Sequence, residues 1–148
     1  FFCFQHEGII PDIVTLAKGL ANGLPIGATL SDLDFEPGDH GSTFGGNSLC
    51  CSVALKTIEL IEKLIPQIGS KSNYLVSGLK NIPQLKNIRG KGLMLAFDIE
   101  QADKFKEKLA EKGILVNSIN NSKIRLLPPL TISFKEIDEA LEAIKCLA

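Results

Sequence analysis

The sequence has almost no net charge, no long apolar run and no paired cysteine motif. Its 16 basic and 17 acidic residues give a formal charge of -1, which leaves no electrostatic footprint for a nucleic acid or an anionic membrane. No apolar run approaches the ~20 residues that a membrane-spanning helix needs, and no basic stretch with an apolar core marks a secretion signal. We therefore expect a cytoplasmic protein with no nucleic-acid or membrane partner.

The sequence also lacks the spacings of metal, triad and nucleotide sites. None of its four cysteines forms a C-x-x-C pair, and Cys50 and Cys51 are adjacent, so we expect reduced thiols packed as small apolar groups and no metal. His6 and His40 have no companion at ligand or triad spacing. Neither a G-x-x-x-x-G-K-[ST] nor a G-x-G-x-x-G motif is present.

The 148 residues are 45% hydrophobic, which is typical of a packed globular protein. Their charge is uneven: residues 1–65 hold three basic against eight acidic groups, net -5, and the remainder holds 13 against nine, net +4. Together with Pro66, this switch predicts two modules with a boundary near residues 65 to 70. Because the chain opens with Phe1 and its one methionine is Met94, we expect a processed chain or the tail of a longer one.

Short β-like segments alternate with helical ones along the chain, which predicts an α/β fold. Pro66 is expected to end or restart a helix, and Asn120 to Ser122 to form a hairpin turn. Ser133 and Glu136 have the spacing of a capping box at the start of the last helix. The predicted strands are 13–17, 26–30, a buried one containing 92–97, 114–119 and 123–127, and the predicted helices are 48–65, 67–81, one from 102 that ends at Gly113, and one after 133. The second module is thus predicted to hold a three-stranded sheet.

Lys18 is the only lysine in the first 55 residues and follows an apolar strand. If Leu16, Ala17 and Leu20 desolvate it, its charged form is disfavoured and a nucleophilic amine results. The alternative is an ordinary solvated lysine at the start of a loop.

Two further segments have the chemistry of anion binding. Residues 38–47, which are rich in glycine and include Ser42 and Thr43, lead into a helix whose N-terminus favours an anion; the alternative is a capped surface loop. Arg125 lies on a short strand before Pro128 and Pro129, and its guanidinium can bind a carboxylate with two hydrogen bonds. The alternative is an arginine paired with a nearby acid.

The order of these motifs resembles that of the class III pyridoxal-phosphate aminotransferases, above all their branch that acts on N-acetylornithine, ornithine and lysine-pathway substrates. The resemblance runs essentially from end to end. The segments that carry it are Pro11-Asp12-Ile13-Val14-Thr15-Leu16-Ala17-Lys18-Gly19-Leu20, Gly23-Leu24-Pro25-Ile26-Gly27-Ala28, His40-Gly41-Ser42-Thr43-Phe44-Gly45-Gly46-Asn47, Arg89-Gly90-Lys91-Gly92-Leu93-Met94 and Ile124-Arg125-Leu126-Leu127-Pro128-Pro129.

The resemblance implies a fold-type-I enzyme in which residues 1–66 end the large, mostly parallel-sheet domain that binds pyridoxal 5'-phosphate and residues 67–148 form the small C-terminal α/β domain. It implies a homodimer that transfers the terminal amino group of N-acetylornithine, or of an ornithine- or lysine-type substrate, to 2-oxoglutarate. Lys18 matches the lysine that binds the cofactor and moves the substrate proton. Thr43 matches the residue that contacts the cofactor phosphate of the neighbouring subunit, Ser42 a substrate contact, and Arg125 the arginine that binds the substrate α-carboxylate.

Several parts of the family pattern lie upstream of the lysine and are not in this sequence: the aspartate at the pyridine nitrogen, the phosphate loop, the stacking aromatic residue and the distal arginine. Asn22 also stands where many relatives have glycine. We therefore interpret the chain as the C-terminal part of an aminotransferase that has little activity alone. The alternatives are a non-catalytic dimerisation or small-domain module and another class III enzyme, of the aminomutase or γ-aminobutyrate type.

Overall fold

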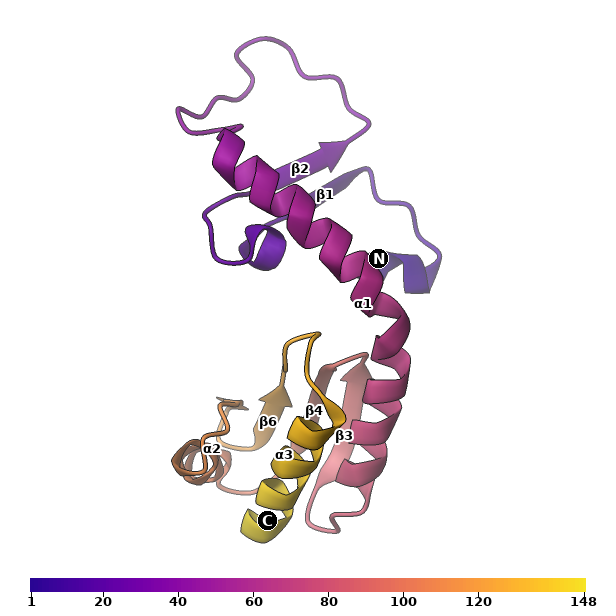
Figure 1. The fold of residues 1–148 in the computed structure, drawn as a ribbon, viewed down its shortest axis with the longest axis vertical. Helices are drawn as coiled ribbons and strands as arrows, with labels where there is room; N and C mark the ends of the chain where they lie inside the picture. Colours follow the sequence, from indigo (N-terminus) through magenta and orange to yellow (C-terminus); the bar gives the residue numbers. More distant parts are fainter. The chain divides into compact units, whose positions relative to one another are not determined.

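A computed structural model describes residues 1–148 as two compact units, 1–63 and 64–148 (Figure 1). Helix α1 begins in the first unit and ends in the second. The elements in chain order are the 3-10 helix η1 (Cys3–Glu7), β1 (Ile13–Leu16), the 3-10 helix η2 (Lys18–Ala21), β2 (Ala28–Ser31), α1 (Ser48–Lys80), β3 (Lys86–Lys91), β4 (Met94–Asp98), α2 (Ala102–Glu111), β5 (Asn117–Ile119), β6 (Lys123–Leu126) and α3 (Phe134–Leu147). None of the helices combines the length and the apolar character that crossing a membrane requires.

The first unit is built on a two-stranded antiparallel pair. Ile13 of β1 lies opposite Ser31 of β2, and Leu16 lies opposite Ala28. The predicted strands 13–17 and 26–30 are confirmed, the second with a shift of about two residues. The turn between them contains the short helix η2, which begins at Lys18.

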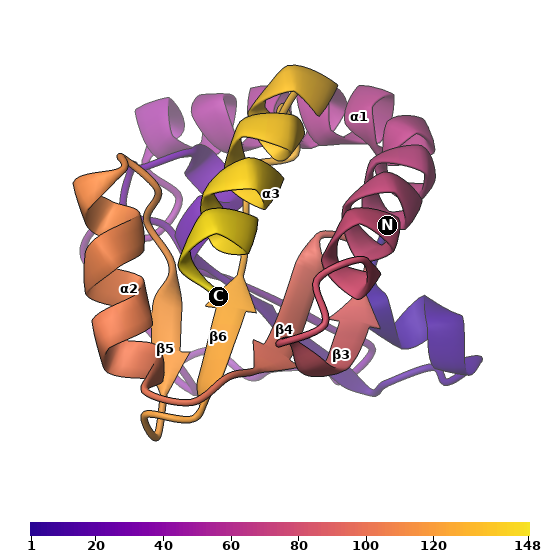
Figure 2. The same cartoon turned by 90° about the horizontal axis from the view of Figure 1, so that it is seen from below.

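The second unit is a four-stranded antiparallel sheet, in the order β3-β4-β6-β5, with its helices on one face (Figure 2). The core forms on that face because alternate residues of the central strands point towards the helices. Phe97 and Ile124 are fully buried there, together with Leu79 of α1, Leu109 of α2 and Ile137 of α3. The residues between them, such as Ala96 and Arg125, consequently point to the opposite face of the sheet.

Two expectations about the middle of the chain are wrong. Pro66 lies inside α1 and neither ends nor restarts it; its ring is exposed, and buried Leu75 and Leu79 further along hold the helix to the core. The predicted three-stranded sheet has four strands. The predicted buried strand containing 92–97 is β4, which starts at Met94, and the additional strand is β3, which precedes it in a hairpin. Gly92 and Leu93 form its turn.

The remaining elements agree with the sequence, except that the predicted strand 114–119 is shorter and covers Asn117–Ile119 as β5. Asn120 and Asn121 adopt the left-handed conformation in the predicted hairpin turn, and Ser133 and Glu136 form the predicted capping box at the start of α3. The four cysteines are free, as expected, but Cys3 and Cys146 are exposed and are therefore not packed thiols.

Candidate functional site

Lys18 has a strained backbone and a free side chain. It follows Ala17, which is fully extended, and begins η2 with a φ of 55°, a conformation that is uncommon for a residue with a large side chain and is enriched at functional sites. The other non-glycine residues with positive φ are five asparagines or glutamines. No hydrogen bond or ion pair within the chain engages its ammonium group, so that group is available to a ligand.

Lys18 is exposed, with Leu16 and Leu20 half-buried beside it and Ala17 exposed. Within this chain these neighbours therefore do not bury Lys18, and the alternative of a solvated lysine describes it. The local turn explains Asn22: it has a φ of 46°, and its N–H donates to the Gly19 carbonyl at 3.1 Å. Asparagine is among the residues that best tolerate this left-handed conformation after glycine.

The loop before α1 presents hydroxyl groups without partners. Ser42 and Thr43 are both exposed, and neither hydroxyl makes a hydrogen bond within the chain. The helix itself begins with a cap, because the Asn47 side-chain oxygen accepts from the Cys50 N–H at 3.1 Å. The structure therefore agrees with a capped surface loop, whose free hydroxyls leave anion binding as a prediction.

A hollow of about 920 Å³ lies beside this loop in the first unit. Thr15 and Thr29 from the strand pair and Ser42 and Phe44 from the loop contribute to its lining. Lys18 and Thr43 are not among the lining residues, so the structure brings only Ser42 of the three predicted residues into this hollow.

Arg125 lies in the second unit, at the centre of the sheet on β6. Ile124 and Leu126 on either side of it face the core, which directs the guanidinium to the opposite face. Its Nη2 donates to the side-chain oxygen of Asn117 at a long 3.4 Å, and its Nε is buried without any hydrogen-bond partner. No acid within this chain forms an ion pair with Arg125. A buried arginine donor without a partner is a group to which an anionic ligand can bind.

The segment after β6 is fixed by a buried lysine. Lys71 of α1 is only 6% exposed, and its Nζ donates to the Leu130 carbonyl at 3.0 Å. A buried ammonium group needs such a partner, and removing either one leaves an unpaired polar group. Lys71 therefore ties the chain beyond Pro128 and Pro129 to α1.

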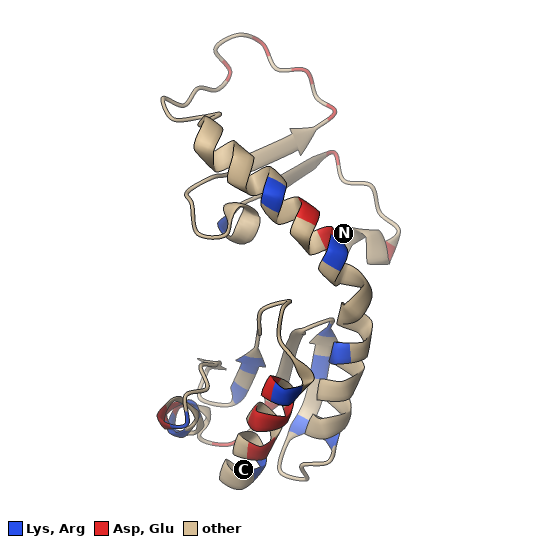
Figure 3. Ribbon diagram, viewed as in Figure 1, with Lys and Arg blue, Asp and Glu red and all other residues tan.

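Lysine and arginine residues gather on β3 and β6 of this unit (Figure 3). On β3, however, Arg89 is already engaged: its Nη1 donates to the Asp98 carboxylate at 2.9 Å. The pKa of Asp98 is lowered, first by the hydrogen bond from the Asn87 side chain and then by that from Arg89. Arg125 is thus the arginine of this sheet that has no acid partner.

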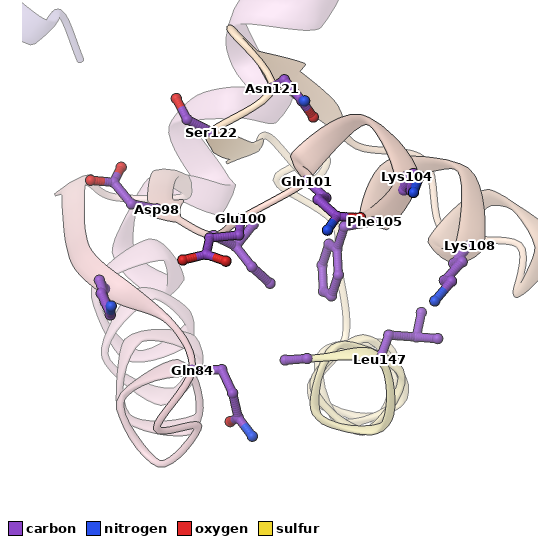
Figure 4. A pocket seen from close by; sticks show the side chains of 13 residues that line it. Gln84, Asp98, Glu100, Gln101, Lys104, Phe105, Lys108, Asn121, Ser122 and Leu147 are labelled. Carbon is purple, nitrogen blue, oxygen red and sulfur yellow. The ribbon is translucent and has the colours of Figure 1, made fainter.

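A separate pocket of about 680 Å³ lies where β4, α2 and the end of α3 meet (Figure 4). Phe105 points into it, and Glu100, Lys104 and Lys108 stand at its sides. It contains none of the residues that the sequence predicts for the site.

Sequence reasoning missed Asn117 as the partner of Arg125, although a signal for it was present. The predicted turn at residues 120–122 sets the register of β5 and β6, and counting back from it pairs residue 117 with residue 125. The structure has this pairing. Lys71 gave no comparable signal, because its burial depends on the distant segment around Leu130.

Comparison with known proteins identifies the fold first. An acetylornithine aminotransferase from Elizabethkingia anophelis matches 97% of this chain and 42% of its own with a TM-score of 0.87 at 32% identity. An ornithine aminotransferase from Toxoplasma gondii matches 97% of this chain and 38% of its own with a TM-score of 0.84 at 32% identity. The fold is that of the C-terminal part of a fold-type-I pyridoxal-phosphate enzyme.

The family model for class III aminotransferases matches residues 1–147, and the chain belongs to that family, whose members depend on pyridoxal phosphate. Acetylornithine aminotransferases from Caldanaerobacter subterraneus and Archaeoglobus fulgidus are 42% and 43% identical to it over 95% and 96% of its length. The chain spans about two fifths of these relatives, 39% of each.

Proposed function

We propose that the complete protein transfers the terminal amino group of N-acetylornithine, or of a close ornithine- or lysine-type substrate, to 2-oxoglutarate. Identity of about 40% to proteins named acetylornithine aminotransferase supports this substrate class. The structural observation that carries the proposal is Arg125, whose buried Nε has no partner within the chain. A guanidinium with a free, buried donor is suited to the carboxylate that amino-acid substrates share.

The residues present fit pyridoxal phosphate, because the free amine of Lys18 suits its aldehyde and the free hydroxyl of Thr43 suits its phosphate. When bound, this cofactor supplies the electron sink for moving an amino group between an amino acid and an oxo acid. Lys18 would hold it covalently and carry the proton to and from the substrate Cα. Thr43 would donate to its phosphate in the neighbouring subunit, and Ser42 would contact the substrate.

The proposal includes the arrangement of the protein. Residues 1–66 would complete the large cofactor-binding domain and residues 67–148 the small domain of a cytoplasmic homodimer that serves arginine or lysine biosynthesis. The first unit exposes several large apolar side chains, among them Ile10 at 92% and Phe44 at 83%. Such side chains are expected to be covered in the complete assembly.

The visible absorbance of the bound cofactor tests the assignment of Lys18. The complete product of the gene is expected to show this band, and Lys18→Ala is expected to abolish it because the covalent link is lost. Lys56→Ala is the matched control: Lys56 is a surface lysine on α1 whose side chain is 64% exposed, and its loss should leave the band intact. A Lys18→Ala protein that keeps the band would show that another residue holds the cofactor.

Steady-state rates with N-acetylornithine, ornithine and a carrier-bound lysine test the substrate. A clear preference for the first is expected, and equal indifference to all three would overturn the acetylornithine proposal. A preference among other amines would instead favour a γ-aminobutyrate-type or aminomutase activity within the same family.

A non-catalytic dimerisation or small-domain module is the second candidate, and the observation that favours it is that residues 64–148 hold a buried core of their own. The coding sequence upstream of Phe1 distinguishes the two. An aspartate motif and a phosphate loop there would support the enzyme, and their absence from the complete gene would support the module, which is expected to have little or no transaminase activity.

A further inference from the structure

Four residues form a row across the face of the sheet that lies opposite the core. The strand registers pair Arg89 with Ala96, Ala96 with Arg125, and Arg125 with Asn117. Side chains of directly paired residues point to the same face of a sheet. Arg125 therefore has a small neighbour on one side, Ala96, and a polar one on the other, Asn117.

The two neighbours leave most of the guanidinium free. Arginine has five N–H donors, and the only one that the chain engages is on Nη2, which donates to the Asn117 oxygen at 3.4 Å. The buried Nε remains without a partner, and the Ala96 side chain has no polar group. Asn117 is thus the one side chain that restrains the plane of the guanidinium.

The Asn117 amide is neutral, and this matters for its effect on Arg125. A carboxylate at this position would neutralise the guanidinium and compete with an anionic ligand, whereas an amide oxygen accepts one hydrogen bond and leaves the positive charge in place. Because Asn117 holds the guanidinium in place, Arg125 loses less conformational freedom when a ligand binds, and its positive charge is kept.

We propose that Asn117 is a positioning residue for the substrate carboxylate, acting through Arg125. Its side-chain oxygen holds the guanidinium in place, so that the N–H donors which the chain leaves free can receive the carboxylate. This inference rests on the proposed function, in which Arg125 binds that carboxylate, and it adds a determinant of KM on the neighbouring strand.

The test uses Asn117→Leu and Asn117→Asp in the complete gene product. Asn117→Leu keeps the approximate size and removes the acceptor, so KM for the amino-acid substrate is expected to rise about tenfold with kcat changed by less than about twofold. Asn117→Asp is expected to raise KM further, because its carboxylate competes for Arg125. Ser118→Ala is the matched control: its hydroxyl faces the other way and donates to Asp103 at 2.5 Å, so KM should not change.

A double-mutant cycle with Arg125→Ala separates this inference from the proposed function. If Asn117 acts through Arg125, Asn117→Leu should have no further effect on KM in the Arg125→Ala background. A rise that persists there, or an unchanged KM in Asn117→Leu alone, would overturn the positioning role. Should the leucine variant not fold, Asn117→Asp decides by the same comparison. If Arg125→Ala itself leaves KM unchanged, the proposal that Arg125 binds the substrate carboxylate is wrong, whatever the effect of Asn117→Leu.

Discussion

At the scale of single residues, the hairpin of β3 and β4 depends on a glycine. Gly90 has a φ of 136°, and a Cβ placed there would lie 2.1 Å from the Met94 carbonyl oxygen. Both the backbone conformation and the backbone contact oppose any larger residue. Gly90→Ala is therefore expected to destabilise the protein by at least about 2 kcal/mol, measured as the free energy of unfolding in urea.

Gly69 is the matched control for this substitution. It lies exposed within α1, and a Cβ there would meet nothing within 4 Å. Because alanine favours a helix over glycine, Gly69→Ala is expected to stabilise the protein by about 1 kcal/mol. Equal effects of the two substitutions would contradict the close backbone contact at Gly90.

Some properties of the candidate site residues follow from the sequence, and others depend on distant segments. Residue type and place made Lys18 and Arg125 candidates beside plainer alternatives, and the family resemblance favoured a role for both; the structure gives both a free donor. Whether Lys18 is covered could not be read from Leu16 and Leu20, because burial depends on segments far along the chain. The partner of Arg125 required the register of two strands, which only the turn between them specifies.

At the scale of elements, the stability of the N-terminus of α3 depends on pH. The pKa of Glu136 is lowered, first by the hydrogen bond from the Ser133 backbone N–H and then by that from its hydroxyl. A carboxylate with a lowered folded pKa stabilises the fold above its unfolded pKa, about 4.3 for glutamate, and loses that contribution as the pH falls through the folded value.

Glu136→Gln is accordingly expected to lower the stability of the protein at pH 7. It should also make stability fall less steeply between about pH 5 and pH 3, the range around the ordinary pKa of glutamate, than in the unsubstituted protein. Thermal unfolding midpoints across this range measure it. Glu142→Gln removes the same charge from the exposed side of α3 without touching the cap, and should leave the slope nearly unchanged. An identical slope in both variants would contradict the role of the capping box.

Elements with strong local signals were predictable, and those that depend on distant packing were not. The capping box fixed the start of α3, and the asparagine turn fixed the hairpin of β5 and β6. Strand β3 gave no signal, because Lys86–Lys91 is nearly all exposed and has no alternation of apolar residues. A proline within a helix costs about 3 kcal/mol locally, and the sequence does not reveal that tertiary packing beyond Pro66 offsets it.

At the scale of the whole molecule, the two units differ in how much apolar surface they bury. Only Ala21 and Ala54 are buried apolar residues in the first unit, and all the other buried apolar residues belong to the second. Regions with few buried contacts open at low free energy, whereas core strands open only on global unfolding. In the 148-residue chain, amides of residues 1–47 are therefore expected to exchange hydrogen at least about a hundredfold faster than those of β4 and β6.

Hydrogen exchange followed by mass spectrometry on the chain alone and on the complete gene product measures this difference. If the first unit is the end of a larger domain, its strands β1 and β2 should gain protection in the complete protein, because side chains such as Ile10 and Phe44 then become buried. The second unit already holds its own core and should show nearly the same protection in both. Protection of β1 and β2 equal to that of β4 in the chain alone would mean that the first unit is stable by itself, and the domain division proposed here would then be wrong.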